Sequence, residues 1–229
     1  MTALADHSAL LADGRRYYES GRFAEAYALF DRLAAEDEPE AWLWLSAMHA
    51  NGDGREVDHT VAYEKCLRAA ELGNIQACTN LGVMLVQGEG VAPDPVAGLA
   101  WLKRAADAGD IGAAFNAASI LSGGKWLDKD LKQAVVYYEH AARAGYHPAQ
   151  ARLGYAYRNG FGVAKDRKKA FIWLSLAARH GIGTAIAMLE GMITEMSRDE
   201  LDQAQQMLDH VFEQADPMLD GARFRVQTH

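Results

Sequence analysis

A step of 36 residues recurs through this chain and constrains its fold more than any other feature. Alanine pairs, single glycines and single aspartates each return at that interval without an insertion or a deletion. A repeat of this size that keeps its register indicates a solenoid of stacked units, in which each unit packs only on its neighbours. The recurring positions are Ala69-Ala70, Ala105-Ala106, Ala141-Ala142 and Ala177-Ala178; Gly73, Gly109, Gly145 and Gly181; and Asp58, Asp94, Asp130 and Asp166.

Apolar residues at helical spacing place two helices in each unit, joined by a turn that is usually rich in glycine. The pattern therefore predicts an all-α protein, a right-handed α/α superhelical solenoid of about six helical hairpins in a single domain over residues 1–215. Residues 216–229 show no period and are expected to form a C-terminal tail. The expected repeats span 5–36, 39–73, 75–109, 111–145 and 147–181, with a capping hairpin at 184–214.

The recurrent residues have mechanical tasks in such a hairpin. Each recurrent aspartate stands just before a second helix, where its side chain caps the free N–H groups of the first turn. Each recurrent glycine follows that helix, where a left-handed residue closes it. The alanine pairs mark close approaches between helices. Ser197 and Glu200 form a capping box for a last helix, whose expected packing face holds Leu201, Ala204, Met207, Leu208 and Val211.

Composition excludes several classes of function. A formal net charge of −8 argues against nucleic acid as the main partner. No run of 18 apolar residues is present to span a membrane, and the first residues do not resemble a secretory signal. Cys66 and Cys78 form no C-x-x-C pair, so we expect reduced thiols. We therefore expect a cytoplasmic protein, monomeric and without membrane contact.

Charge is unevenly distributed along the chain. Residues 1–60 carry 5 basic and 12 acidic side chains, whereas residues 151–181 carry 7 basic and 1 acidic. This basic block has two interpretations, a solvated surface on one repeat or a patch for an anion or an acidic partner. Its members are Arg152, Arg158, Lys165, Arg167, Lys168, Lys169 and Arg179.

These residues together resemble the Sel1-like repeat, a relative of the tetratricopeptide repeat. The resemblance is strong over residues 39–181 and weak at both ends. It implies an α/α solenoid that binds proteins or peptides and often serves as an adaptor, in bacteria and eukaryotes. The matching positions are Ala77, Asn80, Leu81, Gly82, Gly88, Gly90, Val91, Asp94, Trp101, Ala105, Ala106 and Gly109, and again Ala149, Leu153, Gly154, Tyr157, Gly160, Gly162, Val163, Asp166, Ala170, Trp173, Ala177, Ala178 and Gly181.

No motif of catalysis stands out in this sequence. Gly88-Glu89-Gly90 lies between two helices and is followed by Pro93 where a phosphate-binding loop needs another glycine, so it indicates a turn. Gly124-Lys125 is followed by Trp126 and is not a Walker motif. The histidines are scattered, and no two share a helix at metal-binding spacing. We expect no catalytic residue, no metal and no cofactor.

Two classes of function remain. The first is a non-enzymatic scaffold or adaptor that binds a protein or peptide on its concave face, and a toxin-neutralising immunity protein belongs to the same class. The second is an enzyme or small-ligand protein with an unrecognised site. A concave pocket that gathers titratable residues would favour the second class.

The resemblance also places the partner-binding surface. In tetratricopeptide-like stacks the first helix of each hairpin lines the concave side, and residues rotated away from its packing positions face the groove. Positions 36 residues apart occupy the same slot in successive repeats. The residues at the slots that should face the groove vary between repeats, whereas the residues at the packing slots stay nearly constant. Trp44 and Phe115 have a second interpretation, packing on neighbouring helices. The expected partner-binding residues are Trp44, Asn80, Val83, Phe115, Asn116, Ser119, Arg152 and Tyr155.

Overall fold

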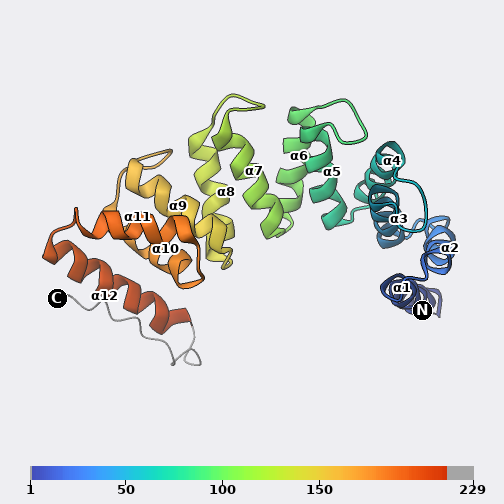
Figure 1. Cartoon of the computed structure of the whole chain (residues 1–229), viewed down its shortest axis with the longest axis horizontal. Helices are drawn as coiled ribbons and strands as arrows, with labels where there is room; N and C mark the ends of the chain where they lie inside the picture. The colour runs from blue at the N-terminus through green and yellow to red at the C-terminus, as the bar shows by residue number, and fades with distance from the viewer. Residues whose placement is uncertain (1, 216–229) are drawn as a thin grey trace. The chain divides into compact units, whose positions relative to one another are not determined.

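Helices follow one another along the chain and pair as hairpins in the computed structural model, which describes residues 2–215 (Figure 1). No strand occurs among these residues, which confirms the all-α prediction. The predicted tail at 216–229 lies outside the described residues. The helices are α1 (Thr2–Glu19), α2 (Phe23–Ala34), α3 (Pro39–Asn51), α4 (His59–Glu71), α5 (Ile75–Gln87), α6 (Pro95–Asp107), α7 (Ile111–Gly123), α8 (Leu131–Arg143), α9 (His147–Asn159), α10 (Arg167–Arg179), α11 (Gly183–Ile193) and α12 (Arg198–Ala215).

The chain divides into two compact units, residues 1–140 and 141–229, with the boundary inside α8. In the first unit the helices pack in chain order, from α1 on α2 through to α6 on α7, and α5 also contacts α7. In the second unit α10 packs on α9, α11 and α12, and α9 contacts α11. In each unit, therefore, first helices of successive repeats lie beside one another. The expectation of a single domain over 1–215 stays a prediction.

The recurrent aspartates cap the second helices as predicted. In each case Oδ1 accepts a hydrogen bond from the backbone N–H three residues later, a bond that satisfies one unpaired donor of the first turn. The bonds run to Asp58 from Val61 at 3.0 Å, to Asp94 from Ala97 at 2.9 Å, to Asp130 from Gln133 at 2.9 Å and to Asp166 from Lys169 at 3.0 Å.

Two first helices carry the same cap, which the sequence analysis did not identify. Asn74 Oδ1 accepts from the N–H of Ala77 at 2.9 Å, and Asp110 Oδ1 accepts from the N–H of Ala113 at 2.6 Å. Both residues directly follow a recurrent glycine. The glycine that closes one repeat is thus followed at once by the residue that starts the next.

The glycine-rich turn of the third repeat is held by backbone contacts. Gly88 ends α5 with φ +77°, and the N–H groups of Gly88 and Glu89 both donate to the carbonyl oxygen of Met84. Gly90, with φ +72°, lies against α4 of the preceding repeat, where a Cβ atom would overlap the carbonyl oxygen of His59. Only glycine suits both its conformation and this contact. The turn therefore joins the third repeat to the second. The N–H groups of Gly88 and Glu89 are already bonded to Met84.

Each unit has its own apolar core. In the first, fully buried Phe30, Leu33, Leu45 and Met48 connect α2 with α3. In the second, Phe171, Leu174, Met192, Ala204 and Leu208 connect α10 with α11 and α12.

The predicted packing face of the last helix is only partly right. Ala204 and Leu208 are buried and Leu201 is half-buried, but Met207 and Val211 are 43 % and 37 % exposed. The physical reason is that α12 packs mainly on α10, and no described helix follows it to cover the side that holds Met207 and Val211. The predicted capping box is confirmed, because the Ser197 N–H donates to Glu200 and the Glu200 N–H donates to Ser197.

Candidate partner-binding groove

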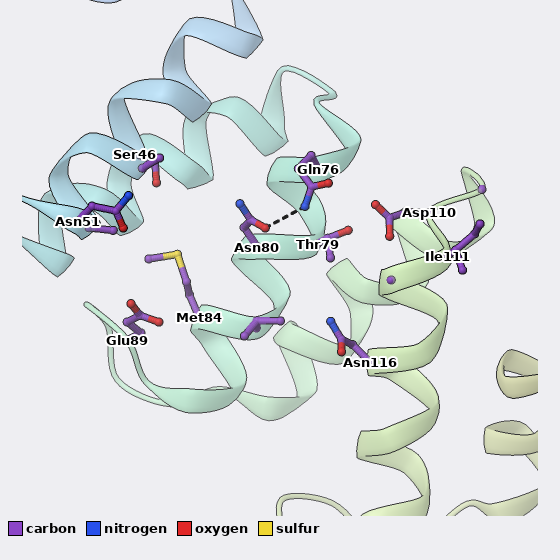
Figure 2. Close-up of a pocket in the computed structure, with 15 residues that line it drawn as sticks. Ser46, Asn51, Gln76, Thr79, Asn80, Met84, Glu89, Asp110, Ile111 and Asn116 are labelled. Atoms are coloured by element: carbon purple, nitrogen blue, oxygen red, sulfur yellow. Dashed lines mark hydrogen bonds between the residues drawn. The ribbon is translucent and has the colours of Figure 1, made fainter. Parts of the chain in front are cut away.

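A groove with a volume of about 740 Å³ lies in the first unit between α3, α5 and the start of α7 (Figure 2). These are the first helices of three successive repeats. Its apolar lining comes from Ala47, Ala50, Val83, Met84 and Ile111. The polar lining is dominated by side-chain amides, those of Asn51, Gln76, Asn80 and Asn116.

Two of these amides form a pair on α5. Gln76 Nε2 donates to Asn80 Oδ1 at 3.1 Å, one helical turn away (Figure 2). The bond leaves the Gln76 carbonyl oxygen and an Asn80 N–H available, because a carboxamide has two donors and an acceptor with two lone pairs. The side chain of Asn116 has no hydrogen-bonding partner among the described residues. The groove thus offers donors and acceptors that the protein itself does not use.

The hydroxyl groups of the groove have structural tasks instead. Ser46 Oγ donates to the carbonyl oxygen of Ala62 at 2.7 Å and joins α3 to α4. Thr79 Oγ1 donates to the carbonyl oxygen of Ile75 at 3.3 Å within α5. Both residues are buried. They form the polar floor of the groove, and the amides form its accessible wall.

Both charged residues of the lining are acidic. Asp110 caps α7 through Oδ1, as described above. Glu89 lies in the turn after α5, and its Oε1 is 3.3 Å from Nδ1 of His59. In Figure 2 the Gln76–Asn80 pair lies between the two carboxylates.

The structure brings three of the expected partner-binding residues together in this groove. Asn80, Val83 and Asn116 all line it. Asn80 and Asn116 hold the same slot in successive repeats, one on α5 and one on α7, so the repeat itself places both of them in the groove lining. Their contact with a partner stays a prediction.

Trp44 lies instead in an aromatic cluster with the first hairpin. Its ring stacks on Phe30 with a centroid distance of 5.4 Å and an interplanar angle of 5°, and Tyr18 lies 5.1 Å away on the same measure. Its Nε1 donates to Oε1 of Glu40 at 3.3 Å. These contacts account for Trp44 by packing, the second interpretation that the sequence left open.

Phe115 and Ser119 pack towards α8. The Phe115 ring lies 5.8 Å from that of Tyr138, and Ser119 Oγ donates to the Phe115 carbonyl oxygen at 2.8 Å. Ser119 Oγ also lies 3.4 Å from the Tyr138 hydroxyl. Both residues are half-buried, and neither lines the groove.

Arg152 and Tyr155 belong to the second unit, where both are exposed on α9. Tyr155 is 38 % exposed and makes an edge contact with Phe161, with ring centroids 5.6 Å apart. Contact of Arg152 and Tyr155 with a partner stays a prediction.

Several groove residues were not identified from the sequence. Gln76 precedes Asn80 by one turn, and Asn51 follows Ala47 by one turn, so helical spacing alone contained that signal. Glu89 was assigned only to a turn, and Asp110 follows a recurrent glycine. Both positions had a structural explanation that concealed their place in the groove.

The basic block of the second unit pairs with the C-terminal helices. Arg158 donates to Oε1 of Glu195 at 3.1 Å and to the carbonyl oxygen of Met188 at 3.3 Å. Lys168 Nζ donates to Oε1 of Gln203 at 2.7 Å. A cavity of about 570 Å³ beside these residues is lined by Glu195 and Glu200 as well as by cations. Part of this basic charge is therefore balanced within the chain.

Other chemistry has little support among the described residues. They contain no group of three or more His, Cys, Asp or Glu side chains that could hold a metal ion. None of the described helices is both long and apolar enough to cross a bilayer. The pKa of the Cys66 thiol is raised to about 12, mainly by burial, and the thiol is therefore a poor nucleophile.

Comparisons with known proteins agree with this architecture. A family model described as the Sel1 repeat matches residues 39–74, 75–110, 111–146 and 147–182. A solved Sel1 repeat protein from Oxalobacter formigenes is 29 % identical with a TM-score of 0.70, over 78 % of this chain and 73 % of that one.

A second solved structure resembles this chain over nearly its whole length. It is c5321, a protective antigen present in uropathogenic Escherichia coli strains that displays an SLR fold. It is 22 % identical with a TM-score of 0.78, over 97 % of this chain and 50 % of that one. At this identity the likeness concerns the fold. A search of curated proteins finds no match to this chain.

Proposed function

The chain belongs to the Sel1 repeat family, and we propose that it is a non-enzymatic scaffold that binds an extended segment of a partner protein in the groove between α3, α5 and α7. Sel1 repeat proteins generally mediate protein–protein interactions, and their fold is typically a scaffold rather than an enzyme. The proposal adds the binding surface and the form of the ligand.

The observation that carries this proposal is the set of amides with unused hydrogen-bonding groups on the groove wall. The Gln76–Asn80 pair leaves an acceptor and a donor, and Asn116 leaves both. The backbone of an extended peptide carries one N–H and one C=O per residue, all of which need partners when they leave water. Side-chain amides satisfy both kinds of group and distinguish little between sequences.

The apolar lining supplies the second part of such a site. Ala47, Ala50 and Val83 lie beside the amides, are half-buried and offer a surface on which peptide side chains can pack. A partner therefore gains contact area from these side chains and orientation from the amides.

The groove carboxylates favour a scaffold over an enzyme. Asp110 is engaged as a helix cap and Glu89 lies beside His59. A catalytic acid–base pair must instead reach one reacting group together. The two carboxylates lie on opposite sides of the Gln76–Asn80 pair (Figure 2).

Site-specific photo-crosslinking in cells that produce the protein tests the proposal. A photoreactive phenylalanine analogue replaces Val83 in the groove, and a matched variant carries it at Val96, which lies on α6 and is 68 % exposed. Residues in a binding groove should form covalent adducts with the partner, whereas Val96 should not. We expect a discrete adduct from position 83 that is absent from position 96.

The proposal is wrong if position 96 gives the same adduct as position 83, or gives the only one. In that case the partner contacts another surface. Adding Asn80→Ala and Asn116→Ala to the position-83 variant should remove the adduct while the melting temperature stays the same. Persistence of the adduct in that background would also contradict the proposal.

A further inference from the structure

We infer that the segment bound in this groove carries two basic side chains, one on each side of a short stretch with uncharged side chains. The inference rests on the proposed function and adds the chemistry of the partner. It follows from the charges that line the groove, the arrangement of the amides between them, and the charge of the surrounding unit.

The charged lining of the groove is wholly acidic. Glu89 and Asp110 belong to it, and no lysine or arginine does. Residues 1–140 carry 12 lysines and arginines against 21 aspartates and glutamates, a net charge of −9. A cleft of one sign within a unit of the same sign attracts ligands of the opposite charge and accelerates their association. It also rejects acidic segments, because like charges brought together are costly.

Both carboxylates keep capacity for a ligand. Asp110 uses Oδ1 for the α7 cap, and its other oxygen has no bonding partner among the described residues. Among the described residues the Glu89 carboxylate pairs only with His59, at 3.3 Å, and both side chains of that contact are more than a third exposed. A lysine or arginine can therefore bind either carboxylate without displacing a buried interaction.

The amides between the carboxylates set the form of the segment. Gln76 and Asn80 present donors and acceptors between Glu89 and Asp110 (Figure 2). A helical partner has already paired its backbone groups and could not use these amides along its length. An extended segment has its backbone groups available. Basic side chains at its two ends can then reach the carboxylates.

The basic block of a second copy of this chain is a poor candidate for the ligand. Arg167, Lys168 and Lys169 lie in helix α10, so their backbone is not extended. Lys168 is bonded to Gln203, and Arg167 lies 3.9 Å from Glu200. The inference therefore commits to a basic segment of a different protein.

A positional library of fluorescein-labelled dodecapeptides is the probe that tests the inference. Each pool fixes one amino acid at one position, and binding is measured by fluorescence polarisation against the whole protein. We expect pools with fixed lysine or arginine to bind best at two positions and pools with fixed glutamate to bind worst. The best peptide should bind more weakly as salt rises.

Charge-removing variants locate the effect. With the best peptide, Glu89→Gln and Asp110→Asn should each weaken binding at least fivefold and reduce its salt dependence. Asparagine is as good a helix cap as aspartate, so Asp110→Asn should remain folded. Asp94→Asn is the matched control, since Asp94 caps α6 in the same way and does not line the groove. If Asp110→Asn lowers the melting temperature, Glu89→Gln decides alone.

Two unfavourable outcomes are distinguishable. Peptides whose binding is lost in Asn80→Ala/Asn116→Ala, but which show no basic preference and ignore both charge-removing variants, would overturn the inference and leave the proposed function standing. If no pool binds in a way that depends on Asn80 and Asn116, the proposed function fails, and the inference fails with it.

Discussion

Gly98 on α6 lies directly against the backbone of Gly82 on α5, so that a Cβ atom on Gly98 would stand 2.6 Å from the Gly82 carbonyl oxygen. Real Cβ atoms essentially never come so close to another atom. In the preceding repeat the same two slots hold Ser46 and Ala62, and there the Ser46 hydroxyl bonds the Ala62 carbonyl oxygen. The hairpin that carries Asn80 therefore depends on the absence of side chains at this crossing.

Gly98→Ala should lower the stability of the protein. Although alanine favours the helix over glycine by about 1 kcal/mol, the overlap with Gly82 and Val86 should cost about 1–3 kcal/mol and exceed that gain. Gly123→Ala is the control, because a Cβ atom at Gly123 meets nothing within 4 Å. Thermal unfolding should show a lower melting temperature for the first variant and an equal or higher one for the second. An unchanged melting temperature for Gly98→Ala would show that the two helices separate easily.

The recurrent aspartates should stabilise the repeats individually. Asp94→Ala removes the acceptor of the Ala97 N–H and should cost about 1 kcal/mol of unfolding free energy. Asp94→Asn keeps an acceptor in place and should cost much less. Urea unfolding followed by circular dichroism measures both. Equal losses in the two variants would mean that charge, rather than capping, is the stabilising property.

Stability should also depend on pH through a pair of histidines in the second unit. The rings of His147 and His180 are stacked, 3.5 Å apart at an interplanar angle of 8°. Loss of water around the ring is the main cause that lowers the pKa of His180 from its usual 6.5, and the charges of the neighbouring His147 and Arg179 lower it further. A lowered folded-state pKa means that folding disfavours the protonated form. The contribution of His180 is therefore present above pH 6.5 and is lost as the pH falls through the folded-state pKa.

The measurement is the melting temperature of wild type and His180→Gln between pH 7.5 and 5. The wild-type value should fall more steeply as the solution is acidified. Comparing the two proteins at each pH separates His180 from His7, whose pKa is raised by its bond to Glu36 and whose effect has the opposite sign. Parallel curves would show that the stacked pair does not respond to protonation.

Much of the fold could be predicted because the period encodes both ends of each helix. The sequence places a second helix between Asp94 and Gly109 of the third repeat, and α6 spans Pro95–Asp107. Asp94 and Pro95 define its start and Gly109 its end. The first helix of the expected capping hairpin at 184–214 is α11, which ends at Ile193, where the cap is Thr194 in a right-handed conformation. That end has no glycine to mark it.

The candidate site was less accessible to prediction. Asn80 and Asn116 were expected in the groove and do line it, because their positions follow from the repeat. Trp44 holds the same slot, but its surroundings come from Tyr18 and Phe30 in the first hairpin, which departs from the repeat pattern. Periodicity describes what repeats share and gives no information on contacts made once. Glu89 was hidden for a different reason, because the turn explained it fully.

The central claim is that the groove between α3, α5 and α7 holds the partner, and isothermal titration with a partner segment recovered by crosslinking or from the peptide library tests it most directly. The titration compares wild type with Asn80→Ala/Asn116→Ala, whose folding is verified by its melting temperature. The account predicts at least a tenfold loss of affinity in this variant and none in the Val96→Ala variant, since Val96 is exposed on α6 and does not line the groove. Unchanged affinity in the folded double variant would contradict the account and move the binding site to another surface.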